Sequence, residues 1–174
     1  WNIAVPHNIV GPRQRYDDPY RNVISIMINR NLQGKPSIIY GDGMQKRCFS
    51  YIDDCIFCLE KLTLDDSINY ETINIGPDKG TITIKELSQL IANETGFNGK
   101  PIHHKDRPNE VKYAMCSSDK ARSLLNFESK TDIKYAIKKT TEWIKKNGIM
   151  KFDYSNKLEI INKKTPITWK NKLI

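Results

Sequence analysis

Short apolar segments alternate with amphipathic segments along most of this chain, and this alternation constrains the fold more than any other feature. Strands are predicted over residues 2–5, 37–40, 47–52, 72–75 and 102–104. Helices are predicted over residues 23–33, after Asp53 or Asp54, and over 83–96, 118–125 and 131–148. Because helices separate the strands, the expected class is α/β. Residues 151–174 are basic with scattered apolar positions, and the pattern predicts no element there.

Capping residues mark several predicted helix boundaries. Asn22 precedes a helix whose apolar positions recur every fourth residue from 24 to 32. Thr83 followed by Glu86 forms a capping box, in which each side chain bonds the other residue's backbone N–H, and Gly96 ends that helix. Within residues 47–52, alternation predicts Arg47, Phe49 and Tyr51 on one face.

Two of the four cysteines form a C-x-x-C motif that invites a metal interpretation. Cys55 and Cys58, however, fall with Leu59 and Leu62 at the i, i+3, i+4, i+7 positions of a helix's apolar face. The other two cysteines supply no second pair at metal-like spacing. We therefore predict buried thiols and no metal site, and reduced thiols favour a cytoplasmic protein.

The charge of the chain leaves several partner classes to weigh. The formal net charge is +8, and a basic surface can attract nucleic acid, a membrane surface or phosphorylated metabolites. No RNA-binding aromatic strand, zinc finger or basic heptad accompanies the lysines. The longest apolar run is too short to span a bilayer. We therefore expect a lysine-rich surface with neither nucleic acid nor membrane as partner.

Two arginines stand near aromatic and acidic residues in a pattern suited to a nucleotide. Arg47 follows the glycine turn of residues 41–43, and Arg107 precedes Glu110 by three positions. The planar guanidinium forks suit a diphosphate, Tyr40 or Phe49 suits the base, and the acid suits ribose hydroxyls. The competing interpretation is that the arginines are surface charges, the aromatics belong to the core and the acid lies in a polar loop.

The same predicted pocket would gain donors from a helix. A helix beginning at Asn22–Val23 would aim backbone N–H groups at the phosphates.

A series of motifs resembles one known family. These are NIVGPRQ at 8–14, IIYGDGMQKRCFSYIDD at 38–54, INIGP at 73–77, TIKEL at 83–87, RPNEV at 107–111 and SSDKARSLLNF at 117–127. Their order and spacing resemble the C-terminal half of extended short-chain dehydrogenases/reductases that act on nucleotide sugars. Within this family, the chain resembles UDP-sugar 4-epimerases most, and its resemblance to dehydratases and decarboxylases is slightly weaker. The resemblance covers roughly residues 2–147.

The resemblance implies a fold and a division of the chain. The fold would be the end of a Rossmann-like sheet together with the nucleotide-sugar subdomain. Residues 1–147 would be the substrate-binding portion, and 148–174 a basic tail without assignment. The complete enzyme would use NAD and form a homodimer.

The resemblance also implies roles for individual residues. Asn8 would bond the diphosphate or the sugar, and Tyr40 would lie against the base with Phe49 lining the nucleotide. Asn22 and Val23 would bind a phosphate, and Arg47 and Arg107 would bind the diphosphate. Glu110 would bind the ribose. Pro6 and His7 would lie where the chain passes the nicotinamide of NAD. Cys48, where the family usually has aspartate, and Val5, near which it often has arginine, depart from the family pattern.

The glycine-rich dinucleotide loop and the catalytic tyrosine and lysine that the resemblance would imply are not found in the sequence. The sequence contains no G-x-x-G-x-x-G dinucleotide loop. Tyr135 and Lys139 have the Y-x-x-x-K spacing but follow every substrate motif, so we interpret them as helix surface. With Trp1 opening what resembles a core strand, we expect a partial, inactive chain with no catalytic residue. The alternatives are a related dehydratase or decarboxylase, a stand-alone nucleotide-sugar-binding module, or a basic nucleic-acid-binding protein.

Overall fold

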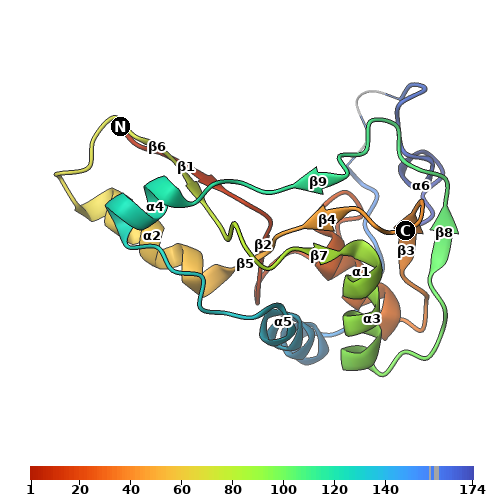
Figure 1. Cartoon of the computed structure of the whole chain (residues 1–174). Helices are drawn as coiled ribbons and strands as arrows, with labels where there is room; N and C mark the ends of the chain where they lie inside the picture. Colours follow the sequence, from red (N-terminus) through yellow and green to blue (C-terminus); the bar gives the residue numbers. More distant parts are fainter. Residues whose placement is uncertain (157, 159–160) are drawn as a thin grey trace.

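The computed structural model describes residues 1–156, 158 and 161–174 and has an elongated α/β architecture (Figure 1). Its helices follow the chain as α1 (Val23–Leu32), α2 (Ile52–Leu64), α3 (Ile84–Thr95), α4 (Asp119–Leu125), α5 (Ile133–Asn147) and α6 (Ile167–Lys170). Its strands are β1 (Ile3–Pro6), β2 (Ile9–Val10), β3 (Ile38–Tyr40), β4 (Lys46–Arg47), β5 (Ser50–Tyr51), β6 (Thr72–Ile75), β7 (Ile82–Thr83), β8 (Ile102–His104) and β9 (Tyr113–Ala114). No described helix has the length and apolar character needed to cross a membrane.

The strands form small sheets in which parallel pairing dominates. β1 pairs with β6, β2 with β5 and β3 with β8, all in parallel. The remaining sheet has the order β7-β4-β9, in which β4 is antiparallel to β7 and parallel to β9. The predicted α/β class is therefore confirmed, because parallel neighbours are joined through helical crossovers.

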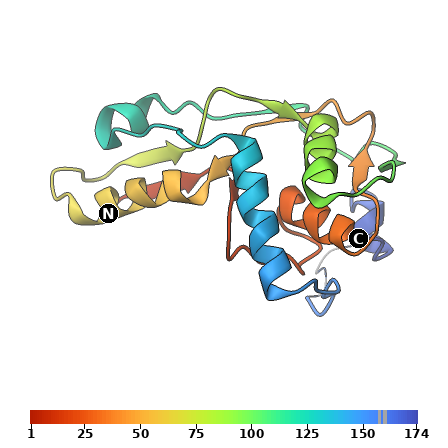
Figure 2. The same cartoon turned by 90° about the horizontal axis from the view of Figure 1, so that it is seen from below.

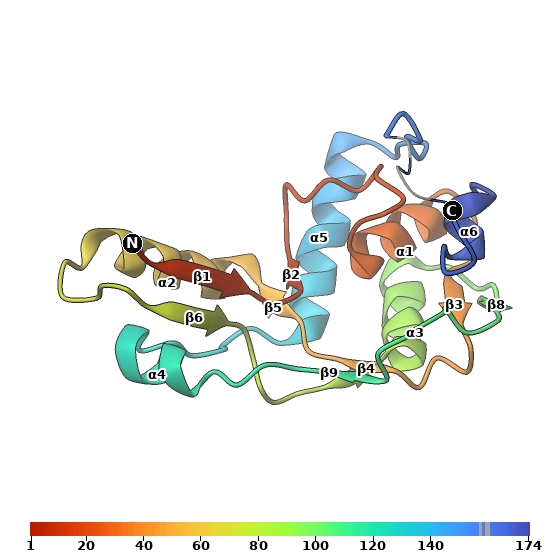
Figure 3. The same cartoon turned by 90° about the horizontal axis from the view of Figure 1, so that it is seen from above.

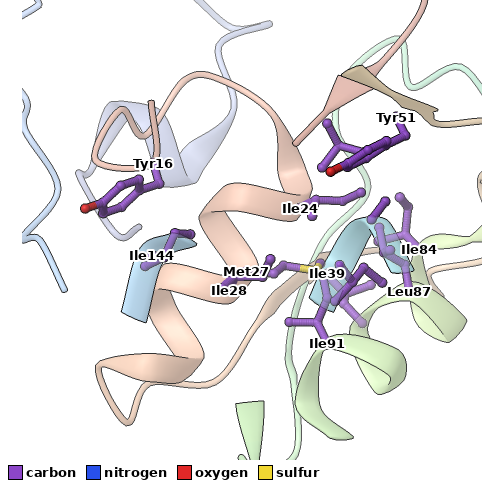
Figure 4. Packing of buried hydrophobic residues seen from close by; sticks show 13 residues of the cluster. Tyr16, Ile24, Met27, Ile28, Ile39, Tyr51, Ile84, Leu87, Ile91 and Ile144 are labelled. Carbon is purple, nitrogen blue, oxygen red and sulfur yellow. The ribbon is translucent and has the colours of Figure 1, made fainter. Parts of the chain in front are cut away.

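Two apolar cores lie at the two ends of the molecule. At one end, α2 and α4 lie beside β1 and β6 (Figure 3). Cys55, Cys58, Ile73 and Leu125 are fully buried among these elements. At the other end, α1, α3 and α5 bury the larger cluster that includes Ile24 (Figure 4). Helix α5 crosses between the two ends (Figure 2). The predicted burial of both cysteines is confirmed, whereas Leu59 on the same helix is partly exposed.

Local capping signals decide several of these helix boundaries. Asn22 accepts a hydrogen bond from the backbone N–H of Ile24 and caps α1, as predicted. Thr83 and Glu86 form the predicted capping box, and Gly96 closes α3 in the left-handed conformation with φ 74°. Each boundary follows from chemistry within a few residues along the chain.

Two predictions about residues 47–54 are wrong. The single strand expected over 47–52 is two short strands, β4 and β5, which belong to different sheets. The expected cap at Asp53 or Asp54 is also absent, because Tyr51 occupies the N-cap position. Asp54 instead accepts hydrogen bonds from the backbone N–H groups of Lys130 and Thr131. The carboxylate thereby ties the start of α2 to the loop before α5.

Candidate functional site

A cavity of about 270 Å³ lies where α1, β3, β4 and the loop after β8 meet α6. All eight residues predicted to bind substrate line it, namely Asn8, Asn22, Val23, Tyr40, Arg47, Phe49, Arg107 and Glu110. These residues come from segments far apart in the sequence, so the fold itself assembles the predicted set.

The glycine turn after β3 brings Arg107 into this cavity. Gly41 has φ 61°, and a Cβ at this position would collide with Oδ1 of Asp106. Because glycine has no side chain and tolerates positive φ, the loop holding Asp106 and Arg107 can lie against the turn. Gly43, with φ 76°, completes the reversal that leads into β4 and Arg47.

One carboxylate joins the two arginines. Nη2 of Arg47 lies 2.7 Å from Oε1 of Glu110, and Nε of Arg107 lies 3.6 Å from Oε2. The side chains of Arg47 and Glu110 are only 17% and 12% exposed. A charge-assisted contact with so little solvent is stronger than an exposed ion pair. The three groups leave one net positive charge at the cavity wall.

The guanidinium of Arg107 lies over two aromatic rings. Its Cζ is 5.2 Å from the centroid of Tyr40 and 5.1 Å from the centroid of Trp169. The Tyr40 hydroxyl in turn hydrogen-bonds the hydroxyl of Thr168, which is fully buried. Burial raises the pKa of Tyr40, so the phenol stays protonated. Both Thr168 and Trp169 belong to the tail that the sequence left without an element.

Asn8, Asn22 and Phe49 line the other side of the cavity, and each of them also makes contacts within the protein. The amide nitrogen of Asn8 donates to the backbone carbonyl of Cys48 at 2.9 Å and contacts Nε2 of His7 at 3.1 Å. The side chain of Asn22 is occupied in capping α1 and in bonding the carbonyl of Ile9. Phe49 lines the cavity and also packs against the larger core.

The two residues predicted to pass the cofactor lie outside the lining of this cavity. Pro6 is exposed at the carboxyl end of β1, and His7 follows it half-buried. Burial lowers the pKa of His7, a hydrogen bond with the backbone of Ala114 opposes this shift, and the nearby charge of Arg47 adds to it. Ligands of parallel sheets bind outside the carboxyl ends of strands, which is where this pair lies.

Other sequence candidates do not join the site. Tyr135 is 49% exposed on α5, and Nζ of Lys139 lies 2.9 Å from Glu142, so this pair is helix surface as predicted. Among the described residues, no group of three or more His, Cys, Asp or Glu side chains is placed to hold a metal ion.

The sequence missed the contribution of the tail to the cavity. Thr168, Trp169 and Ile174 line it, so the described part of the tail contributes to the cavity wall. The signal available was Pro166 ahead of the segment Ile-Thr-Trp-Lys, since proline is common at a helix start. Residues 157 and 159–160 of the tail lie outside the described residues.

Comparisons with solved structures identify the architecture. The UDP-glucose 4-epimerase of Thermotoga maritima, solved with UDP-glucose, is 30% identical with a TM-score of 0.74, covering 84% of this chain and 46% of that chain. The UDP-glucuronic acid 4-epimerase of Bacillus cereus, solved with UDP-glucuronic acid and NAD, is 30% identical with a TM-score of 0.73, covering 84% and 45%. The fold is thus that of Rossmann-like extended short-chain dehydrogenases/reductases.

Sequence comparisons indicate which enzyme family the chain resembles. Residues 2–76 match the NAD dependent epimerase/dehydratase family. A putative UDP-glucose 4-epimerase of Methanocaldococcus jannaschii is 38% identical over 81% of this chain and 44% of its own length. A UDP-N-acetyl-alpha-D-glucosaminuronate decarboxylase of Bacillus cytotoxicus is 32% identical over 79% and 44%. The chain therefore spans less than half the length of these relatives.

Proposed function

We propose that this chain holds the nucleotide sugar, as a UDP-sugar, in an NAD-dependent 4-epimerase. The observation that carries the proposal is the pair of arginines that share Glu110 at one cavity wall. A planar guanidinium bonds phosphate oxygens through two parallel N–H groups, and two of them match a diphosphate. Similarity to epimerases solved with UDP-glucose and UDP-glucuronic acid supports the uridine diphosphate.

Each part of the ligand would meet a different group of the cavity. Arg47 and Arg107 would bond the diphosphate, with the backbone N–H of Val23 at the positive end of α1 as a further donor. Glu110 would accept from ribose hydroxyls while it keeps both guanidiniums in place. Tyr40 would lie against the base, and Phe49 would exclude water beside it.

Asn8 is better suited to the sugar than to the diphosphate. Its amide nitrogen already bonds the Cys48 carbonyl, so the amide oxygen is the atom left to meet a ligand. An oxygen acceptor pairs with a sugar hydroxyl, whereas a phosphate oxygen would need a donor. Binding energy from the nucleotide would in this way orient the reacting sugar carbon.

The residues present fit one edge of a nicotinamide site. Pro6 and His7 lie at the carboxyl end of β1, and burial keeps His7 neutral, which suits a neighbour of a cationic ring. When bound, NAD would supply reversible hydride acceptance at the sugar ring. The sequence lacks the glycine-rich loop that holds the pyrophosphate. We therefore propose that residues 1–174 hold substrate without turning it over, within a complete enzyme that is a homodimer.

Calorimetry of the 174-residue chain with UDP, UDP-glucose and uridine tests this function. We expect UDP and UDP-glucose to bind, and uridine to bind much more weakly because it offers no phosphate to the arginines. A chain that binds uridine as well as UDP, or binds none of the three, would overturn the proposal. An assay of the same sample with NAD and UDP-glucose should show no epimerisation above a blank.

A second candidate is a decarboxylase or dehydratase of the same family. The 32% identity to a UDP-N-acetyl-alpha-D-glucosaminuronate decarboxylase favours it. A decarboxylase needs a sugar that carries a carboxylate, so titration with UDP-glucuronate beside UDP-glucose tests this candidate. Weaker binding of the uronate sugar would count against a decarboxylase, whereas tighter binding would fit either a decarboxylase or a UDP-glucuronic acid 4-epimerase like that of Bacillus cereus.

A further inference from the structure

The tail carries two neighbouring residues that hold two predicted ligand-binding side chains. Thr168 bonds the Tyr40 hydroxyl, and the Arg107 guanidinium lies over the indole of Trp169 as well as over the ring of Tyr40. Helix α6 lies beside β3 in Figure 3. One short turn of chain therefore controls both an aromatic and a cationic group of the cavity.

The tail is fixed to the body of the molecule rather than lying loosely on it. The Trp169 ring packs edge-on against Tyr20 with centroids 5.5 Å apart. Nη1 of Arg30 donates to the carbonyl of Leu173 at 3.1 Å. The Tyr154 hydroxyl donates to the carbonyl of Ile174 at 2.7 Å. These contacts hold α6 in one place, so Trp169 can hold Arg107.

Contact with two aromatic rings restricts the positions that a guanidinium can take. Nε of Arg107 faces Glu110, and no hydrogen bond to another described residue occupies its two Nη groups, which can therefore meet a ligand. Without Trp169 the side chain would keep only its contacts with Glu110 and Tyr40 and would sample more rotamers, so ordering it again on binding would cost rotamer entropy. The arrangement is a preformed half of a diphosphate clamp.

We propose that Trp169 is a positioning residue of the nucleotide site, acting through Arg107, with Thr168 doing the same for Tyr40. This inference rests on the proposed function, since it assigns part of the same site to the tail. The ligand class it concerns is a nucleoside diphosphate. Because Trp169 acts through a phosphate-binding group, its loss should affect UDP more than uridine.

The test compares tail variants of the 174-residue chain by calorimetry with UDP and uridine. Trp169→Leu should weaken UDP binding about fivefold, from the worth of one cation–π contact, and Trp169→Phe should restore most of it. Ile167→Ala is the matched control, because Ile167 lies on the same helix, is exposed and does not line the cavity. In an Arg107→Ala background, Trp169→Leu should add almost no further loss.

A spectroscopic measurement keeps the inference testable if Trp169→Leu fails to fold. The chain has three tryptophans, so Trp1→Phe with Trp143→Phe leaves Trp169 as the sole emitter. We expect UDP to change its fluorescence with the midpoint found by calorimetry.

The outcomes separate the inference from the proposed function. UDP binding that is unchanged by Trp169→Leu, equally weakened in the Arg107→Ala background, or silent in Trp169 fluorescence overturns the inference and leaves the function standing. A wild-type chain that binds no UDP overturns the function and the inference with it.

Discussion

Glu110 lies 2.7 Å from Arg47 and 3.6 Å from Arg107, so one carboxylate sets the positions of two guanidiniums that enter the cavity from different strands and loops. Without it, two like charges would repel each other in a site that excludes much of the solvent. A diphosphate would meet both arginines already in place.

Removal of Arg47 should weaken diphosphate binding selectively. Arg47→Ala loses one charge-assisted contact and leaves Glu110 facing the phosphates, so UDP affinity should fall about tenfold or more. Arg47→Lys should also lose affinity, because an ammonium cannot bond Glu110 and a phosphate in one plane. Calorimetry with UDP and uridine measures how much affinity each ligand loses.

Lys46→Ala is the control for Arg47→Ala. Lys46 is exposed on the same strand, and its replacement by alanine removes the same charge. If Lys46→Ala weakens UDP as much as Arg47→Ala, long-range attraction rather than a clamp explains the affinity. If uridine weakens equally with UDP, Arg47 acts on folding or on the base.

Stability should fall at mildly acidic pH because of His7. Burial lowers the pKa of His7 below its ordinary value of 6.5, so the unfolded chain takes up the proton first as the pH falls. The contribution of His7 is therefore fully present above pH 6.5 and is lost as the pH decreases below it. Denaturant unfolding at pH 7.5 and pH 5.5 should show a smaller decrease for His7→Gln than for wild type.

His103→Gln serves as the control for His7, because His103 lies exposed on β8. An NMR titration of the His7 ring that gives a midpoint at or above 6.5 would contradict the expectation.

The four cysteines should react with a thiol reagent in two phases. Burial raises the pKa of Cys55 to about 11, and Cys48, Cys55 and Cys58 are fully buried. Cys116 is half-buried, so it should react first in the native chain at pH 8 although burial raises its pKa too. Ellman's reagent should modify this thiol first and the other three after unfolding, and Cys116→Ser should abolish the first phase. Rapid modification of Cys55 would show that α2 opens readily.

Loss of the last four residues should destabilise the body of the protein. Arg30 is 5% exposed, and its guanidinium donates to the carbonyls of Pro36 and Leu173. Truncation after Lys170 removes one of these acceptors, which costs about 1.5–3 kcal/mol for a hydrogen bond to a charged group. Urea unfolding measures the change. Lys172→Ala, which keeps the backbone, should leave stability nearly unaltered, and equal loss in both variants would refute the account.

Local chemistry determined what could be predicted of the fold. The caps at Asn22, Thr83 and Gly96 were predictable because their partners lie within three or four residues. The break between β4 and β5 was not, because β4 pairs with β7 and β9 while β5 pairs with β2, and no local pattern reveals such partners. Asp54 failed as a cap because a distant backbone segment at Thr131 competes for it.

Side-chain chemistry grouped seven of the eight cavity residues into a possible pocket, but only the order of the family-like motifs favoured that pocket over surface charges and core aromatics and added Asn8. Singly, Tyr40 or Arg107 has too many ordinary explanations to indicate a site. Trp169 was not predictable, because the tail lies outside those motifs and its position depends on packing against Tyr20 and Arg107.

The parallel pairing of β1 with β6 and of β3 with β8 has a kinetic consequence. Ile3 meets Thr72 and Ile38 meets Ile102, so the chain must close long loops before these sheets contribute any stability. Such high contact order makes folding slow, and the cavity is complete only after β8 and α6 have docked. A ligand that binds only the completed cavity would slow unfolding and leave the rate of folding almost unchanged.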